Sequence, residues 1–378
     1  MAAAKQNPMG SAGPGEALLT AMVSASWDRP VRIASWEVEK VDYPFASPAT
    51  AGLFRVRGTT GENQPWSLFA KVLQHPRHWA GIDQVPAELR EDFEAAFPWR
   101  GELVAWEPAF VAALPPGLRV PFLHRVVDLG ADRLVLWMED VDIDPGPWDP
   151  PRFARAGHLL GGLAARRCDC RALAASGVPA GLGLRRYVKG RVLPMLQVLQ
   201  RDEFWAHPLV AAVVDARLRR DLAELAGRLP AVLDRLDRCP QSLPHGDASP
   251  QNLLPVRNEP GTLVVIDTAF QCPQAIGFDL GQLLIGLVHA GELSAASLES
   301  DDAQIMAAFA RGLAEGGVDV PAAEVVYGHH GSLLARAGFT AFPLEHLGDP
   351  PTPTLEELFA QRAALTRYIA DSALALQP

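Results

Sequence analysis

The pattern of apolar residues changes near residue 140, and this change limits the folds that the chain can adopt. Before it, apolar and polar residues alternate as in strands, over residues 31–41, 53–58, 66–73 and 134–139. After it, apolar residues recur at helical spacing, over residues 153–167, 210–228 and 355–374. Proline-rich breaks at 145–151 and 350–353 interrupt the helical part.

This pattern predicts an α+β protein with a two-lobed fold: a small sheet-rich N-terminal lobe and a larger helical C-terminal lobe. We expect a flexible tail over residues 1–16, the first lobe over 17–139 and the second over 140–378. The length of 378 residues, with 48% hydrophobic content, is sufficient for two such cores. Two lobes that share one extended connection, Met138 to Asp142, would form a cleft.

Composition excludes several classes of protein. No apolar run is long enough to cross a bilayer, and the first residues lack the order of a secretory signal, so we expect a cytoplasmic protein that does not bind membranes. The four cysteines have no metal-ligand spacing and are expected to be free thiols. The net charge of −10 argues against a nucleic-acid partner and is compatible with a cationic small molecule. The sequence predicts no oligomeric state.

The segment LPHGDASPQNLL, residues 243–254, crowds small polar groups between apolar flanks. Asn252 lies five positions after Asp247, the spacing of the kinase catalytic loop H-R-D-L-x-x-x-N, with glycine in place of arginine. In that loop the aspartate orients an attacking hydroxyl, and the asparagine oxygen holds a magnesium ion. The alternative is an Asx-turn in which Asp247 and Asn252 only bond nearby backbone.

Two further aspartates follow this loop. Asp267 ends the apolar segment LVVID, where kinases place the D-F-G aspartate as a second magnesium ligand, although Thr268-Ala269 replaces Phe-Gly. Asp279, in GFDLG, opens an apolar helix and is expected to be its N-cap; in the kinase interpretation it also holds the catalytic loop in place.

The N-terminal half offers residues for nucleotide phosphates. Lys71 stands in FAKVL as the lysine stands in V-A-I-K, and Glu102, in the expected helical stretch 99–110, is the candidate to pair with it. The alternatives are an edge-strand lysine and an exposed glutamate, with Glu94 and Glu107 as competitors. The hairpin FASPATAG, residues 45–52, lacks G-x-G-x-x-G, so phosphates would meet backbone amides and Ser47 or Thr50, or the segment is a plain hairpin loop.

Taken together, these residues resemble the aminoglycoside phosphotransferase and choline kinase family. The matches are His245-Gly246-Asp247, Asn252, Ile266-Asp267 and Asp279-Leu280, and residues 99–118 also look like the helix and Leu-Pro-Pro-Gly loop of actinobacterial members. The resemblance covers residues 30–370, roughly. It implies a protein-kinase-like two-lobed fold that uses Mg-ATP to phosphorylate a hydroxyl of a small molecule.

The resemblance also implies roles for individual residues. Lys71 and a magnesium ion held by Asn252 and Asp267 would fix the triphosphate, while Asp247 would orient the acceptor hydroxyl. His245 would brace the loop, and the adenine would pair with backbone groups around Met138, Glu139 and Asp140.

The residues after Asp279 are the candidates for contacts with the acceptor. Candidate contacts follow Asp279 along the chain: His289, Glu292, Asp301 and Asp302. Their carboxylates, with the acidic net charge, favour a cationic acceptor such as an aminoglycoside or a basic peptide antibiotic, unless they are only solvated helix-end charges. A metabolic sugar or amino-alcohol kinase and a catalytically inactive binding module are the alternatives. A protein kinase is disfavoured, because only eleven residues separate Asp267 from Asp279 and leave no room for an activation segment.

Overall fold

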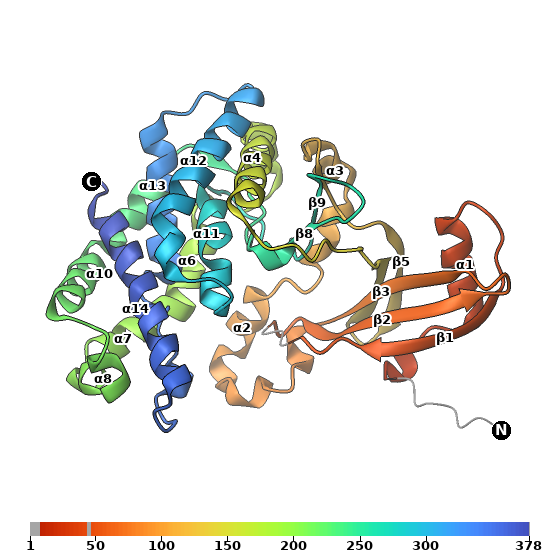
Figure 1. Cartoon of the computed structure of the whole chain (residues 1–378), viewed down its shortest axis with the longest axis horizontal. Coiled ribbons are helices and arrows are strands. Elements are labelled where there is room, and N and C mark those ends of the chain that lie inside the picture. Colours follow the sequence, from red (N-terminus) through yellow and green to blue (C-terminus); the bar gives the residue numbers. More distant parts are fainter. Residues whose placement is uncertain (1–7, 44–46, 378) are drawn as a thin grey trace. The chain divides into compact units, whose positions relative to one another are not determined.

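The protein consists of two compact units, drawn in Figure 1, and the chain passes between them three times. The computed structural model describes residues 8–43 and 47–377. One unit, here called the sheet-rich unit, comprises Met1–Pro108 and Val120–Ile143; the other, the helical unit, comprises Ala109–Arg119 and Asp144–Pro378. The segment Ala109–Arg119 therefore belongs with the C-terminal part of the chain, although the sequence places it in the first lobe.

The sheet-rich unit is built on a five-stranded antiparallel sheet in the order β1-β2-β3-β6-β5. Its strands are β1 (Ile33–Lys40), β2 (Thr50–Thr60), β3 (Pro65–Gln74), β5 (Leu123–Gly130) and β6 (Arg133–Glu139). Four of these were predicted from alternation. Strand β5 was not, because it is an edge strand with mostly exposed side chains and no regular apolar pattern.

Successive side chains along each strand point to opposite faces of this sheet, so each face is covered by every second residue. On one face, Phe54, Val56 and Ala70 pack with Leu19 of helix α1 (Glu16–Ser26). The other face carries a second cluster, which contains Leu73, Leu134, Leu136 and Met138 with the partly buried Phe69, Trp99, Leu103 and Trp106. Lys71 lies between Phe69 and Leu73 on β3 and therefore shares this second face.

Short helices precede and connect the strands of the sheet-rich unit. They are the 3₁₀ helices η1 (Gly10–Ala12), η2 (Pro76–His78), η3 (Ile82–Gln84), η4 (Ala87–Leu89) and η5 (Gly101–Trp106), and helix α2 (Arg90–Ala96). The helix expected over 99–110 is interrupted: η5 ends before Glu107, which is extended, and α3 (Pro108–Ala113) begins anew. Proline disfavours helical backbone at the residue before it, which explains the break.

The tail predicted over residues 1–16 is too long. Met9 is 7% exposed and packs in the same core as Leu19, and α1 begins at Glu16.

The helical unit contains most of the helices. Beyond α3 they are α4 (Pro150–Arg166), α5 (Cys170–Ala175), α6 (Leu182–Tyr187), α7 (Leu193–Leu199), α8 (Asp202–Ala206), α9 (Pro208–Ala211), α10 (Ala216–Leu236), α11 (Phe278–Ala290), α12 (Leu298–Glu315), α13 (Ala322–Leu333) and α14 (Pro353–Leu374). Two π-helical turns, η6 (Val188–Val192) and η9 (Leu334–Gly338), continue α6 and α13. Helices α4 and α12 lie side by side (Figure 1), and glycines such as Gly161 and Gly312 allow their backbones to approach closely.

Two small sheets complete the helical unit. Strand β4 (Leu118–Arg119) pairs in parallel with β9 (Leu263–Val265), which pairs antiparallel with β8 (Leu253–Pro255). The second sheet joins β7 (Gln241–Ser242) and β10 (Gln274–Ala275). Three further 3₁₀ turns are η7 (Pro250–Asn252), η8 (Ala295–Ser297) and η10 (Leu344–His346).

The predicted α+β class is confirmed: a small antiparallel sheet unit and a larger helical unit. The helices expected at 153–167 and 355–374 match α4 and α14 closely. The helix expected at 210–228 is wrong in its bounds, because the Asp215 carboxylate accepts a hydrogen bond from Leu218 N at 2.7 Å and starts α10 there.

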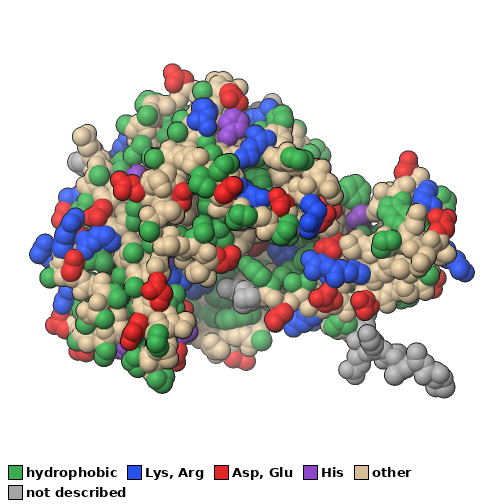
Figure 2. Space-filling view, viewed as in Figure 1, with side chains coloured by type: hydrophobic (Ala, Val, Ile, Leu, Met, Phe, Trp, Pro, Cys, Tyr) green, Lys and Arg blue, Asp and Glu red, His purple; other side chains and the backbone are tan. Residues whose placement is uncertain are grey.

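No described helix combines the length and the apolar character that a membrane span requires. The four cysteines carry free thiols, as expected. On the face shown in Figure 2, Lys and Arg side chains are interspersed with Asp and Glu and form no continuous basic band.

Candidate active site

The loop around Asp247 is held by the carboxylate of Asp279. The backbone N–H groups of His245 and Gly246 donate to its Oδ2 and Oδ1 at 2.7 and 2.9 Å. Gly246 has φ 92°, and a Cβ there would lie 2.6 Å from the carbonyl oxygen of Phe270. A glycine is therefore needed at the position where the kinase loop has arginine.

Asp279 is not the N-cap of α11, so that prediction is wrong. Gly277, with φ 105°, is the N-cap residue, and Asp279 stands in the first turn. Burial raises the pKa of the Asp279 carboxyl above its ordinary value, against the opposing effects of His245, the two backbone N–H groups and Arg336. Its contacts instead correspond to the second role expected for it, that of fixing the loop.

Asp247 lies in a network of three side chains. His245 is fully buried, and its Nδ1 accepts from Asp247 N at 3.2 Å. Asn252 Nδ2 donates to the carbonyl oxygen of Asp247 at 2.9 Å and approaches its Oδ2 at 3.3 Å. Arg336 approaches Oδ1 at 3.3 Å and donates to Gly246 O at 2.8 Å. Sequence reasoning had not identified Arg336, which comes from the π turn η9.

Asn252 and Asp267 are brought together by the β8–β9 hairpin. Ile266 N donates to Asn252 O at 3.1 Å, so Asp267 follows directly after the residue bonded to Asn252. Asp267 has φ 61°, a left-handed conformation that is uncommon outside glycine. Such outliers cluster at functional sites.

These two residues fit a magnesium ion. The Asn252 amide uses its nitrogen on Asp247, as the Asx-turn alternative also allows, and this orients its oxygen as a neutral donor. Asp267 adds a half-buried carboxylate. Amide and carboxylate oxygens are the ligands that a hard divalent cation prefers.

In the sheet-rich unit, Lys71 pairs with Glu102 at 2.6 Å. Their side chains are 12% and 7% exposed, so the pair is largely removed from water. Strand β3 is central in the sheet, which excludes the edge-strand alternative for Lys71. Glu102 is buried in η5, whereas its competitor Glu107 is exposed.

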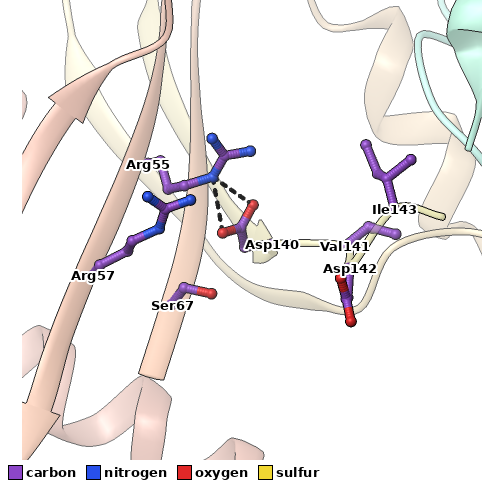
Figure 3. A pocket seen from close by; sticks show the side chains of 7 residues that line it. All are labelled: Arg55, Arg57, Ser67, Asp140, Val141, Asp142 and Ile143. Carbon is purple, nitrogen blue, oxygen red and sulfur yellow. Dashed lines mark hydrogen bonds and ion pairs between the residues drawn. The ribbon is translucent and has the colours of Figure 1, made fainter. Parts of the chain in front are cut away.

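The connector after β6 forms a cavity of about 370 Å³ (Figure 3). It is lined by Arg55, Arg57, Ser67, Asp140, Val141, Asp142 and Ile143. Arg55 Nε lies 2.9 Å from both carboxylate oxygens of Asp140. Glu139, which was expected to lie by the adenine, donates its backbone N–H to Phe122 O at 2.8 Å and accepts from Phe122 N at 3.0 Å through Oε2.

The phosphate-covering hairpin receives little support. Residues 44–46 lie outside the described part of the chain. Ser47 Oγ accepts from Ala49 N at 3.3 Å, as in a tight turn. Thr50 is 6% exposed at the start of β2, so its hydroxyl is not presented to a ligand.

The residues expected to contact the acceptor are not gathered into one site. His289 and Glu292 are exposed, and His289 is ten residues along α11 from Asp279, about 15 Å at 1.5 Å per residue. Asp301 is half-buried in the first turn of α12.

Asp302 is 4% exposed and is neither a solvated charge nor a group open to an ammonium ligand. It accepts hydrogen bonds from His329 Nε2 at 2.7 Å, from His330 Nε2 at 2.8 Å and from the Tyr368 hydroxyl. Burial alone would raise the pKa of Asp302, but the charges and hydrogen bonds of the two histidines outweigh it and hold that pKa well below its usual range. These distances indicate a hydrogen-bonded network joining α12, α13 and α14.

The known proteins that resemble this chain are solved structures of low sequence identity. No family model matches the chain, and no curated protein matches it. Among solved structures, an aminoglycoside phosphotransferase from Alicyclobacillus acidocaldarius is 14% identical, with 91% of each chain covered and a TM-score of 0.48. A choline/ethanolamine kinase family protein from Mesorhizobium loti is 16% identical over 96% of this chain and 97% of that one, with a TM-score of 0.47.

Its structural neighbours are aminoglycoside phosphotransferases and choline or ethanolamine kinases. A macrolide 2′-phosphotransferase is also similar, at 14% identity over 96% of both chains and a TM-score of 0.43. A fold of this kind does not determine the chemistry, which depends on the residues of the site.

Proposed function

We propose that the protein is an ATP-dependent O-phosphotransferase that uses Mg²⁺ and phosphorylates a hydroxyl group of a small molecule. The observation that carries the proposal is the loop of the helical unit, in which Asp279 fixes the backbone of His245 and Gly246 and so directs Asp247. Asn252 and Asp267 beside it supply oxygen ligands of the kind that magnesium needs.

In this proposal Asp247 accepts a hydrogen bond from the acceptor hydroxyl and orients it for in-line attack on the γ-phosphorus. Arg336 and Asn252 hold the two carboxylate oxygens of Asp247, so little rearrangement is needed. The hydroxyl proton passes to Asp247 as the new P–O bond forms and the bond to ADP breaks. A magnesium ion held by Asn252 and Asp267 would neutralise charge on the phosphates.

The sheet-rich unit supplies the nucleotide contacts. Glu102 fixes the Lys71 ammonium, which would bind phosphate oxygens as a point charge. Phe69 lies two residues before Lys71 on the same face of β3, opposite Met138, and is half-buried. We assign it to the adenine as an aromatic surface for stacking. Residues two apart on a strand share a face, so the position of Phe69 two residues before Lys71 could have identified it from the sequence.

Several acceptors fit this chemistry. The sequence favours a cationic antibiotic such as an aminoglycoside, which would make the protein a resistance enzyme, and a sugar or amino alcohol of metabolism is the alternative. The burial of Asp302 removes one of the carboxylates on which the cationic acceptor depended. The combination of Lys71, Asp247, Asn252 and Asp267 opposes an inactive binding module.

The test separates Asp247 from Asp267. Asp247→Asn should retain ATP binding, measured by calorimetry, and lose most ADP release with an active acceptor. Asp267→Asn should also weaken the apparent affinity for Mg²⁺. Asp319→Asn, which removes the same charge at an exposed position after α12, serves as the matched control. ADP release by Asp247→Asn at the rate of the unmutated protein would refute the role of Asp247. ATP binding with the same affinity in the presence and absence of Mg²⁺ would refute the magnesium site.

A further inference from the structure

A single guanidinium joins Asp247 to the outer surface of the helical unit. Arg336 contacts Asp247 with one nitrogen and lies over the rings of Phe278 and Tyr187, at 5.2 and 5.5 Å from their centroids. Its side chain is only 16% exposed. Tyr187 is 36% exposed at the end of α6, and the π turn η6 that follows packs against η9. The surface around Tyr187 is therefore a near neighbour of Asp247.

The segment that contains Tyr187 is basic in an otherwise acidic protein. Residues 170–201 contain six Lys and Arg residues and no Asp or Glu, although the whole chain has 44 acidic residues and a net charge of −10. Arg185 is neutralised by Asp234 and Asp237 of α10 and its end, at 2.7 and 2.6 Å.

Other cations near Tyr187 have no such partner. Arg186, Lys189 and Arg191 are exposed, and no ion pair joins any of them to a carboxylate among residues 8–43 and 47–377. Arg191 follows Tyr187 by four residues, so it lies about one helical turn away on the same side. Unneutralised cations on the helix that carries Tyr187, whose ring Arg336 also contacts, favour an anion.

We infer that the acceptor carries an anionic group, a carboxylate or a phosphate, which binds at Arg191 beside Tyr187, in the positive field of Arg186 and Lys189, while its hydroxyl meets Asp247. The inference rests on the proposed function for the role of Asp247, but the anion subsite stands on its own charges. A polycationic acceptor would bring its ammonium groups against Arg336 and these three cations, which is unfavourable. Arginine suits this task because its planar fork binds a carboxylate or phosphate through two hydrogen bonds.

Binding without turnover tests the subsite directly. Citrate and inorganic phosphate, titrated by calorimetry, should bind the unmutated protein, and Arg191→Glu should weaken that binding at least tenfold. Arg311→Glu makes the same charge change at an exposed position of α12 and should bind both anions as the unmutated protein does. Preference for citrate or for phosphate identifies which anionic group the subsite takes. Absence of binding, or equal binding by the two variants, overturns the inference.

Transfer then tests the acceptor. Gluconate, glucose 6-phosphate, glucose and glucosamine share a hexose framework and differ in charge, and a wider library of hydroxylated acids, neutral compounds and amines extends the series. Each is incubated with Mg-ATP and examined by mass spectrometry for an added phosphate.

The outcomes separate the inference from the proposed function. Phosphorylated products should come from the anionic compounds, and Arg191→Glu should raise their KM at least tenfold with the KM for ATP unchanged. Products from neutral or cationic compounds alone overturn the inference and leave the kinase chemistry intact. No product from any class, with anion binding lost in Arg191→Glu, refutes the proposed function and supports the anion subsite.

Discussion

Replacing Asp279 with asparagine should release the loop that carries Asp247. The carboxylate accepts two buried backbone N–H groups, at 2.7 and 2.9 Å, and an asparagine has one oxygen and an NH₂ group in the same space. One N–H keeps a neutral partner and the other loses its acceptor. Hydrogen bonds to charged groups contribute about 1.5–3 kcal/mol and an unpaired buried donor costs about 1–3 kcal/mol.

The expected loss for Asp279→Asn is therefore about 2–4 kcal/mol, since the burial that raises the pKa of this carboxyl already offsets part of its contribution. At 1.36 kcal/mol per factor of ten, the amides of His245 and Gly246 should exchange with solvent about 30- to 900-fold faster than in the unmutated protein. Exchange at these amides is the appropriate readout because a protein of two units need not unfold in one step.

Hydrogen exchange read by NMR or mass spectrometry measures this effect at the loop itself. Asp301→Asn is the matched control, since it removes the same charge from a half-buried site in the first turn of α12 and should leave the loop amides unchanged. Exchange within threefold of the unmutated protein at both amides of Asp279→Asn would show that the carboxylate does not hold the loop.

Three further predictions concern stability. Lys71→Met removes the ammonium that pairs with Glu102 and should lower the free energy of unfolding in urea by about 3–5 kcal/mol. The double variant with Glu102→Gln should recover part of this free energy, and no recovery would refute the coupling of the two side chains. Asp302 has a pKa held below its unfolded value, so its contribution is complete above about pH 4 and is lost as the pH falls. Asp302→Asn should therefore lower the melting temperature at pH 7. At pH 3 the difference in melting temperature between this variant and the unmutated protein should be smaller, and a difference that does not depend on pH would contradict this. Gly246→Ala should lower the free energy of thermal unfolding by at least about 2 kcal/mol, because the backbone there is left-handed and a Cβ would approach Phe270 O. Gly190→Ala, with open space around it, should lower it by less than about 1 kcal/mol, and equal losses would refute the reasoning.

The sequence predicted those features that depend on local pattern. Alternation located β3 and hence Lys71, and helical periodicity located α4 and α14, because one buried face imposes its period on each element. Edge strand β5 and the start of α10 at Asp215 were missed, since solvent exposure erases the pattern of the first and the apolar run through Val213 and Val214 hides the cap of the second.

Contacts between distant residues that no motif marks could not be predicted from one sequence. Arg336 meets Asp247 across 89 positions, and a π turn directs it there, a feature with no simple sequence signal. Likewise, Asp302 looked like a surface charge because the helices that bring His329, His330 and Tyr368 to it are set by tertiary packing. The acidic net charge pointed to a cationic acceptor, whereas the local distribution of charge over residues 170–201 points the other way.

Because the chain passes three times between the units, no single cut separates it into one whole unit and the other. Strand β4, at Leu118–Arg119, precedes the last strands of the sheet-rich unit in the chain yet pairs with β9 of the helical unit. A cut after Ile143 would therefore leave each fragment incomplete: the N-terminal piece would carry an unpaired strand, and the C-terminal piece would lack one strand of its three-stranded sheet. The two fragments should reassociate into the folded protein, and the pairing of β4 with β9 is the contact that reassociation must restore.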